Sequence, residues 1–508
     1  MRPLIFLSFL VSGCLIYDAV PNNRDMTGCV LSPECNLDGG AQSDMEGACT
    51  GCGDMHIGDS GDMAGCKMMC PGQPDMMQLC TTSAQCTTVA APICETNQCR
   101  ACSSSSDDGQ CAVHSASTPH CDATSGECVA CTPANNLQSA QCTTATTPVC
   151  GTGNVCRSCA AQAECTSLVC NVDGSCADPS TVAYVNNQNG TCTGTHAGTI
   201  TDPICDVQTA ITSGGKATIR VIGSTTAYGA VAISTGTVTI VGPTSGTTAQ
   251  IKGTLSAPPI QITGASTVVT LDSLEITGAS GQDGIDSTNA VAGPSLTILR
   301  SNIHGLSGYG VSAQKGTLII DRTAITGNSG GGISLTGVQF NITNSYIVAN
   351  TATQAGVTFG AGSAPIAGGG FLHNTVAGNG GVGFAGGIAC NQGGASALPI
   401  VNSIVWNNSK SGTGATATQI AGNCSFTYVD TDEGTTPAGT GNKNIAPDFA
   451  NATTPTTAAD YHLSGRTTNN LACCVDQIAT SSVTHDFDGV LRPINVKWDE
   501  GANEVAFP

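Results

Sequence analysis

Two stretches of the sequence, LIIDRTAITGN at residues 318–328 and FNITNSYIVAN at residues 340–350, share one pattern of apolar and polar residues. Each has two inward apolar positions separated by one residue, a polar turn, a further isoleucine and a final asparagine. Alternation of apolar and outward-facing residues is the periodicity of a β-strand. The pattern therefore predicts short strands, and the offset of 22 residues between the two stretches predicts a repeat.

The same apolar triplet recurs six times, with its last members 27, 22, 22, 30 and 28 residues apart. The triplets are Val269/Leu271/Ile276, Leu296/Ile298/Ile303, Leu318/Ile320/Ile325, Phe340/Ile342/Ile347, Gly370/Leu372/Ala377 and Leu398/Ile400/Val405. A further run follows a glycine at Gly310-Val311, Gly332-Ile333, Gly356-Val357 and Gly387-Ile388. Several short strands per repeat, with no helix between them, predict a mostly β protein with a parallel β-helix, or solenoid, whose coils stack about 4.8 Å apart.

Asparagines recur at two positions of this repeat. One position holds Asn344, Asn374 and Asn402, with Arg300 and Arg322 in the earlier coils, and the other holds Asn328, Asn350 and Asn408. Stacked asparagines at turns bridge successive coils and tolerate left-handed backbone. We interpret both sets as structural ladders rather than as a binding site.

The two quoted stretches resemble right-handed parallel β-helix proteins of the pectin-lyase-like superfamily, over about residues 182–475. The resemblance implies a first strand at Ala183-Tyr184-Val185 and a short helix at residues 206–211 that caps the first coil. Cys192 and Cys205 flank this start and Cys390 and Cys424 offer a second staple at the far end. For the adjacent Cys473 and Cys474, a strained bond to each other and partners elsewhere both remain open.

The C-terminal sequence resembles the choice-of-anchor β-helix proteins, whose tail reads roughly D-x-D-G-x-x-R-P and then D-x-G-A-x-E. Here the matching segments are Asp486-Phe487-Asp488-Gly489-Val490-Leu491-Arg492-Pro493 and Asp499-Glu500-Gly501-Ala502-Asn503-Glu504. Asn503 stands where an aromatic residue is usual, and Cys473-Cys474 where small residues are expected. The resemblance implies a cap over residues 471–508 that closes a surface β-helix.

Residues 79–177 contain four successive units of four cysteines, joined by Cys-x2-Cys junctions. The units are Cys80/Cys86/Cys94/Cys99, Cys102/Cys111/Cys121/Cys128, Cys131/Cys142/Cys150/Cys156 and Cys159/Cys165/Cys170/Cys176. Each unit can close as two disulfides in three ways, among which the sequence does not choose. No aromatic residue lies between Tyr17 and Tyr184, so an ordinary core is excluded there and a disulfide-rich stalk with little secondary structure is predicted.

The first residues predict export. Arg2 and the apolar run at residues 4–11 form a signal peptide over residues 1–13, too short to span a membrane. Val11-Ser12-Gly13-Cys14 resembles the lipobox of bacterial lipoproteins, which implies a lipidated Cys14 and, with Leu15 after it, an outer-membrane destination. The structural alternative is an ordinary signal peptide with a chance cysteine. Without Cys14, 28 of the 29 cysteines remain, an even number that suits an exported disulfide protein.

Residues 14–78 are predicted to be a flexible acidic spacer with five Asp-Met pairs. Methionine and cysteine are soft ligands that suit Cu(I), and Cys49-x2-Cys52 with Cys66-x3-Cys70 mimics a zinc site. We favour a linker and disulfides over either metal, because the methionine spacing is irregular and an exported compartment is oxidising. No metal or other cofactor is therefore expected.

The composition excludes a nucleic-acid partner. The 508 residues carry 36 acidic and 16 basic side chains, for a net charge of −20, whereas nucleic-acid binders present basic patches. Only nine Lys or Arg lie between residues 181 and 470. That scarcity leaves few residues for the enzyme chemistry of the superfamily, in which lyases need an Arg or Lys base and hydrolases need paired aspartates.

One local cluster, Arg300, His304, Asp321 and Arg322, is the candidate catalytic set. We interpret it as a salt-bridged rung with Arg300 and Arg322 one coil apart, and His373 as a solvated surface histidine. The expected function is a non-catalytic surface β-helix over residues 178–470, tethered to the outer membrane by its lipid, that contacts extracellular polysaccharide or another cell surface. A polysaccharide lyase or hydrolase and a purely structural envelope protein are the alternatives.

Overall fold

The computed structural model describes residues 80–506, except 133–136, 189–191, 193–194, 279–280, 289–291, 352–355, 383–384, 395, 412–418 and 452–456. The chain divides into two compact units, Met1–Cys128 and Val129–Pro508. The predicted signal peptide, the lipidation of Cys14, the spacer and its metal-ligand alternatives all lie outside the described residues.

The four cysteine repeats share one disulfide connectivity, first to third and second to fourth. The bonds are Cys80–Cys94, Cys86–Cys99, Cys102–Cys121, Cys111–Cys128, Cys131–Cys150, Cys142–Cys156, Cys159–Cys170 and Cys165–Cys176. The bonded half-cystines are mostly buried, so they take the place of an aliphatic core in each repeat.

Regular secondary structure in the repeats is sparse, as the sequence predicts. The first unit holds 3-10 turns at Ser83–Gln85 and Ser105–Asp107, helix α1 (Asp108–His114), and two antiparallel pairs, β1 (Ile93–Glu95) with β2 (Gln98–Arg100) and β3 (His120–Asp122) with β4 (Glu127–Val129). The second unit begins with the antiparallel set β5 (Leu137–Gln138), β6 (Val149–Cys150) and β7 (Cys156–Arg157), followed by a 3-10 turn at Gln162–Glu164.

An arginine ties successive repeats together at two of the three Cys-x2-Cys junctions. Arg100 donates two hydrogen bonds to Asp107, both 2.9 Å, and Arg157 donates to Glu164 at 2.6 and 3.1 Å. The bond from Arg100 holds the pKa of Asp107 well below its usual value, and Arg157 lowers that of Glu164. The remaining junction, Cys128–Cys131, contains Val129 and Ala130 and no arginine, and the division between the two compact units falls there.

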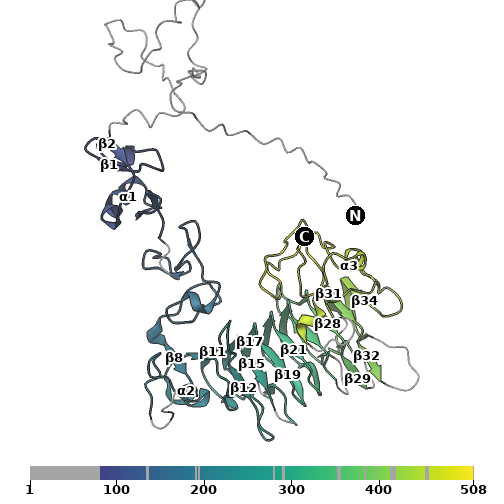
Figure 1. The fold of residues 1–508 in the computed structure, drawn as a ribbon. Helices are drawn as coiled ribbons and strands as arrows, with labels where there is room; N and C mark the ends of the chain where they lie inside the picture. Colours follow the sequence, from purple (N-terminus) through teal and green to yellow (C-terminus); the bar gives the residue numbers. More distant parts are fainter. Residues whose placement is uncertain are drawn as a thin grey trace, which may run out of the picture. The chain divides into compact units, whose positions relative to one another are not determined.

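From Val182 the chain forms a parallel β-solenoid of about seven coils, which confirms the predicted fold class. Each coil contributes one strand to each of three sheets, and Figure 1 shows the strands of successive coils stacked side by side. Sheet 1 contains β8 (Val182–Val185), β9 (Thr218–Val221), β11 (Thr237–Val241), β14 (Val268–Asp272), β17 (Ser295–Leu299), β20 (Thr317–Asp321), β23 (Gln339–Thr343), β26 (Ala364–Pro365), β27 (Phe371–Leu372) and β34 (Cys424–Thr431).

Sheet 2 contains β12 (Gln250–Lys252), β15 (Glu275–Thr277), β18 (Asn302–His304), β21 (Ala324–Thr326), β24 (Tyr346–Val348) and β28 (Thr375–Ala377). The long strand β31 (Leu398–Trp406) continues through the turn and belongs to both sheets 1 and 2. Sheet 3 contains β10 (Val231–Ile233), β13 (Ile260–Ile262), β16 (Ile285–Thr288), β19 (Tyr309–Gln314), β22 (Gly331–Thr336), β25 (Val357–Phe359), β30 (Ile388–Cys390) and β33 (Ile420–Gly422). A small outer pair joins β29 (Gly380–Val382) to β32 (Ser409–Ser411).

The core is a set of aliphatic columns inside the coils. Five of the six predicted triplets lie in it fully buried, as do the residues after the four predicted glycines. The triplet Gly370/Leu372/Ala377 was placed one residue out of register. Phe371 and Val376 are the inward residues, since they pair with Ile342 and Ile347, because extra residues between Pro365 and Phe371 lengthen this coil. A shift of one residue exchanges the two faces of a strand.

An asparagine ladder runs inside the turn after sheet 2, and its members are Asn328, Asn350, Asn379 and Asn408. Each amide Nδ2 donates to the Oδ1 of the next asparagine, at 2.8–3.0 Å, and the last one donates to Gln419. Each amide also donates to a backbone carbonyl of the coil before it. The ladder was predicted without Asn379, and the left-handed residue is the one before each asparagine, for example Ala349 with φ +55°.

The other predicted asparagine slot is wrong for Asn374. Left-handed backbone does recur between sheets 1 and 2, in a column with φ between +48° and +56°, which we name the αL column: Ser273, Arg300, Arg322, Asn344, His373, Asn402 and Tyr428. Asn374 is instead the next residue and lies buried inside the turn. There its Oδ1 accepts from the backbone N–H of Ser345 in the preceding coil. In other coils a hydroxyl at the same position accepts from the backbone of the preceding coil, and these residues are Ser301, Thr323, Ser345 and Ser403.

The first coil is closed as the resemblance implies. Helix α2 (Val207–Ser213) lies against β8, β9 and β10, and the Asp206 carboxylate caps it by accepting from the Thr209 backbone at 2.7 Å. The disulfide Cys192–Cys205 lies beside it. The last cysteine repeat packs on this end through Val169 and Ala177, which contact Val182, Tyr184 and Val241.

The last coil is covered by a cap with little regular structure, which follows β34 and is drawn in yellow in Figure 1. It contains a 3-10 turn at Ala458–Tyr461 and helix α3 (Thr468–Cys473), and a further 3-10 turn at Pro179–Thr181 precedes the first coil. Cys390 is bonded to Cys424, and Cys473 to Cys474. Within the described residues, no helix is both long and apolar enough to cross a membrane.

Candidate functional site

His373 joins the cap to the αL column and is fully buried. The prediction of a solvated surface histidine is therefore wrong. His373 Nδ1 lies 3.0 Å from Arg492 Nη1 and 3.1 Å from the Asp499 carbonyl oxygen. Its Nε2 lies 2.8 Å from Ser481 Oγ and 2.9 Å from Asn402 Nδ2. Burial and the nearby Arg492 lower the pKa of His373 well below its usual value. The sequence missed the partners in the cap because they lie more than 100 residues away.

Arg492 is the centre of a buried ionic network in the cap. It pairs with Glu504 at 3.3 Å, with both side chains fully buried, and donates to the backbone carbonyls of Asp499 and Gly501. Both residues belong to the quoted tail motifs, so the motif residues bind one another and position the cap loops. A buried arginine needs such partners, because an uncompensated buried charge is costly.

One cap loop, residues 486–489, reaches the αL column at Arg322. Arg322 Nε donates to the Phe487 carbonyl at 3.2 Å. Gly489 has φ +85°, and a Cβ atom there would lie 2.4 Å from Arg322 Nη2. The left-handed backbone favours glycine here, and the missing side chain leaves room for the guanidinium, which explains the glycine of the Asp486-Phe487-Asp488-Gly489 motif.

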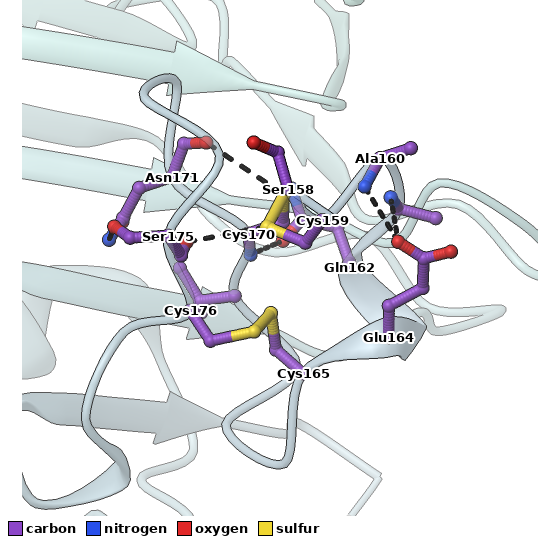
Figure 2. Close-up of a disulfide and its surroundings, with 12 residues drawn as sticks. Ser158, Cys159, Ala160, Gln162, Glu164, Cys165, Cys170, Asn171, Ser175 and Cys176 are labelled. Atoms are coloured by element: carbon purple, nitrogen blue, oxygen red, sulfur yellow. Dashed lines mark hydrogen bonds between the residues drawn. A yellow bond between two sulfur atoms is a disulfide. The ribbon is translucent and has the colours of Figure 1, made fainter. Parts of the chain in front are cut away.

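The last cysteine repeat also contacts the coils beside the αL column. Gln162 Nε2 donates to Asp272 Oδ2 at 3.3 Å, and Asp272 also binds Arg300. Figure 2 shows this repeat, with its disulfides and the Glu164 carboxylate that accepts from the Ala160 backbone. The exposed Ala160 thereby faces the solenoid beside the αL column.

Three adjoining cavities form a groove over the αL column, which we name cavities A, B and C. Cavity A, of about 380 Å³, and cavity B, of about 730 Å³, share Ala160, Arg300 and Arg322. Cavity C, of about 250 Å³, shares Asp321 and His485 with cavity B. Their walls come from the coils, from the last cysteine repeat and from the cap, and the lining is mainly apolar in cavity A, mixed in cavity B and mainly polar in cavity C.

The structure brings three of the four candidate catalytic residues to this groove. Arg300, Asp321 and Arg322 line it, with Arg300 and Arg322 on successive coils as predicted. Arg300 is paired with Asp272, and Asp321 Oδ1 accepts from Thr343 Oγ1 at 2.7 Å. His304 lines none of the three cavities and bonds Glu275 at 3.0 Å, so the four residues do not surround one reacting position.

The two arginines of the groove differ in their electrostatic environment. Burial lowers the pKa of Arg300, but its bonds to Asp272 outweigh this effect and leave the pKa raised. The pKa of Arg322 is lowered by burial and by the charge of Arg300. Across the described residues, no carboxylate lies within 4 Å of Arg322. A partly buried guanidinium without an ion pair is therefore present in the groove wall.

Several groove residues carry no signal in the sequence. Arg157 and Asp173 come from the last cysteine repeat, and His485 and Asp488 from the cap, and they meet only because both segments fold onto the same coils. Asn344 was assigned to a structural ladder, but its neighbours in the αL column are Arg322 and His373. The local pattern gives the position of a residue on its coil, and it does not give the segments that cover that coil.

Comparisons with known proteins cover the two halves of the chain unequally. Residues 69–182, which contain the cysteine repeats, match a family of unknown function, DUF8331. No curated protein matches the chain. A crystal structure of pectate lyase Pel9A aligns with 64% of this chain and 96% of that chain, at 13% identity and a TM-score of 0.38. The fold assigned above rests on the strand pairing, and this likeness carries no argument about activity.

The cap should lose stability as the pH rises. Burial raises the pKa of Asp430 to about 7, where it faces the Ile445 backbone, Cys474, Lys443 and Asp432, and raises that of Asp499 to about 7. The folded state therefore holds protons that the unfolded state releases above pH 4, so the free energy of unfolding falls between about pH 4 and pH 7.

Asp430→Asn should remove about 1.4 kcal/mol per pH unit from this slope between pH 5 and 6.5, the value for one proton. Urea unfolding followed by tryptophan fluorescence measures it, because both tryptophans, Trp406 and Trp498, lie in the last coils and the cap. Ser425→Ala, an exposed change on the same strand, serves as the control. A wild-type slope in Asp430→Asn would show that this carboxyl is ionised in the folded protein.

Proposed function

We propose that the protein is an exported, lipid-anchored surface protein that contacts polysaccharide through the groove of its β-solenoid and does not cleave it. The groove is the observation that carries the proposal. Its three cavities adjoin one another along the coils and present both apolar and polar surface, and such an extended groove suits a polymer of sugar units better than a compact small molecule.

The pairing of the candidate catalytic residues supports binding over cleavage. Arg300 is paired with Asp272, and His304, which lines none of the cavities, is bonded to Glu275 in the wall of cavity A. A general base must come within hydrogen-bond reach of the proton that it removes, and a glycosidase needs two carboxyl groups facing each other across the bond that breaks. In the groove, Arg300 is instead paired with Asp272 and Asp321 accepts a hydrogen bond from Thr343, in each case with a residue of an adjacent coil.

A polysaccharide lyase or hydrolase is the second candidate, and one observation favours it. Arg322 lies in the groove without a carboxylate partner in the described part of the chain, and a lyase of this superfamily needs a basic residue. The shared contact with the Phe487 carbonyl and the glycine of the cap loop gives Arg322 a structural role as well. We therefore rank binding first.

Export rests on the eleven disulfides among the described residues, because such a number forms and persists in an oxidising compartment. The lipid anchor is a proposal that rests on the resemblance of Val11–Cys14 to a lipobox. Stable attachment requires more than one acyl chain, which bacterial lipoprotein processing supplies. Attached at Cys14, the solenoid would be joined to the membrane through the spacer and the cysteine repeats.

Polysaccharide binding and cleavage can be measured on one panel of pectin, alginate, glycosaminoglycans, β-glucan, xylan and galactomannan. We expect retention in affinity electrophoresis on at least one polymer, with no unsaturated uronate and no new reducing ends, with or without Ca²⁺. Ala160→Trp, which places an indole ring in the wall that cavities A and B share, should reduce retention about tenfold. Ala232→Trp, an exposed alanine on sheet 3, is the matched control. Turnover by the wild type that is lost in Arg322→Ala would instead support the lyase or hydrolase function.

Lipidation can be tested by labelling cells with a radioactive fatty acid. Cys14→Ser should abolish the label and leave the precursor uncleaved at this position, because the thiol is the site of acylation in a lipobox. Cys29→Ser, a cysteine outside the motif, is the control and should be labelled normally. Normal labelling of Cys14→Ser would refute the anchor and leave groove binding untouched.

A further inference from the structure

We infer that cavity C is a subsite for neighbouring hydroxyl groups of an uncharged sugar unit, held by Asn344 and Asp321. The inference rests on the proposed function and specifies the ligand of the same groove. It starts from two acceptors on residues that line this cavity: Asn344 Oδ1, which is buried without a partner, and Asp321 Oδ2, to which no donor among the described residues binds.

The first acceptor is Asn344 Oδ1. The residue is 3% exposed, and its Nδ2 donates to Asp321 Oδ1 at 2.9 Å. This bond sets the orientation of the amide, because a flipped amide would place two acceptor oxygens together. Oδ1 is then buried without a hydrogen-bond partner among the described residues, and because Asn344 lines cavity C, a donor on a ligand in that cavity would satisfy it.

The second acceptor is Asp321 Oδ2. Both donors that reach this carboxylate, Thr343 Oγ1 and Asn344 Nδ2, bind Oδ1. In the part of the chain that the structure describes, no donor binds Oδ2, although Asp321 lines both cavities B and C. The hydroxyl of Thr343 has used its hydrogen on Asp321, so this part of the cavity presents oxygen acceptors and calls for O–H donors.

The charge of the cavity selects an uncharged unit. Asp321 is its one carboxylate, His485 is the one basic side chain on its lining, and no lysine or arginine is among its described lining residues. An acidic sugar would bring a second negative charge to this site on a chain of net charge −20. Sugar hydroxyls satisfy the acceptors without that repulsion, and Ser482 and Thr484 on the opposite wall can donate to their oxygens or accept from them.

A purely structural reading of Asn344 fails on its neighbours. The asparagine ladder satisfies each Oδ1 with the amide of the adjacent coil. In the αL column the adjacent residues are Arg322 and His373, and neither donates to Asn344 Oδ1. The left-handed backbone of Asn344 explains why asparagine is tolerated here, and the unsatisfied oxygen requires a separate reason.

Affinity electrophoresis of the full-length protein tests the subsite on β-glucan, xylan and galactomannan against polygalacturonate, alginate and chitosan. We expect retention on an uncharged polymer and about a tenfold weaker affinity for Asn344→Gly, which accepts φ +48° but lacks the amide. Asn407→Gly, an exposed left-handed asparagine outside the groove, should bind normally. Unchanged tryptophan fluorescence of both variants shows that they are folded.

The outcomes separate the subsite from the proposed function. Retention only on the acidic polymers or only on chitosan, or full affinity in Asn344→Gly, overturns the subsite while groove binding stands. If Ala160→Trp weakens retention and Asn344→Gly does not, the polymer occupies cavities A and B alone, and the subsite is again wrong. If wild type is retained by no polymer, polysaccharide contact itself is refuted, and the subsite falls with it.

Discussion

The buried amide ladder of Asn328, Asn350, Asn379 and Asn408 is the interaction on which the later coils of the solenoid, from β21 onward, depend. The coils differ in length, so chain length alone does not set how one coil lies on the next. Each amide bonds both the next amide and a carbonyl of the preceding coil, and one position satisfies both bonds. The ladder therefore fixes the register of the strands beside it.

Register determines which side chains can act together. With sheets 1 and 2 in register, the residue between them takes the left-handed conformation in each coil from β14 to β34, and its side chain points outward. Arg300, Arg322, Asn344 and His373 come into line by this rule, although they are 22 or 29 residues apart in the sequence. His373 contacts the cap, and Asn344 lines the groove. The same position of the coil therefore makes different contacts in different coils.

The sequence predicts what is local and periodic. Strand periodicity located five of the six inward triplets, the asparagines that repeat at a constant offset and the cysteine units. It failed for Phe371, because extra residues between β26 and β27 break the offset on which the prediction relied. It failed for His373, Asn344 and the groove for a different reason. Their partners come from the cap and from neighbouring coils, and the contacts depend on how a non-repeating segment packs, which no period encodes.

The most direct test of this account is the stability of Asn350→Ala. Asn350 accepts from the backbone and the amide of Asn328 and donates to Asn379 and the Ile325 carbonyl, so its loss leaves several buried groups unsatisfied. Urea unfolding followed by tryptophan fluorescence should show a decrease of about 3 kcal/mol in the free energy of unfolding. The exposed Asn302→Ala should change it by less than about 0.5 kcal/mol. An Asn350→Ala protein as stable as Asn302→Ala would contradict the claim that the ladder holds the coils in register.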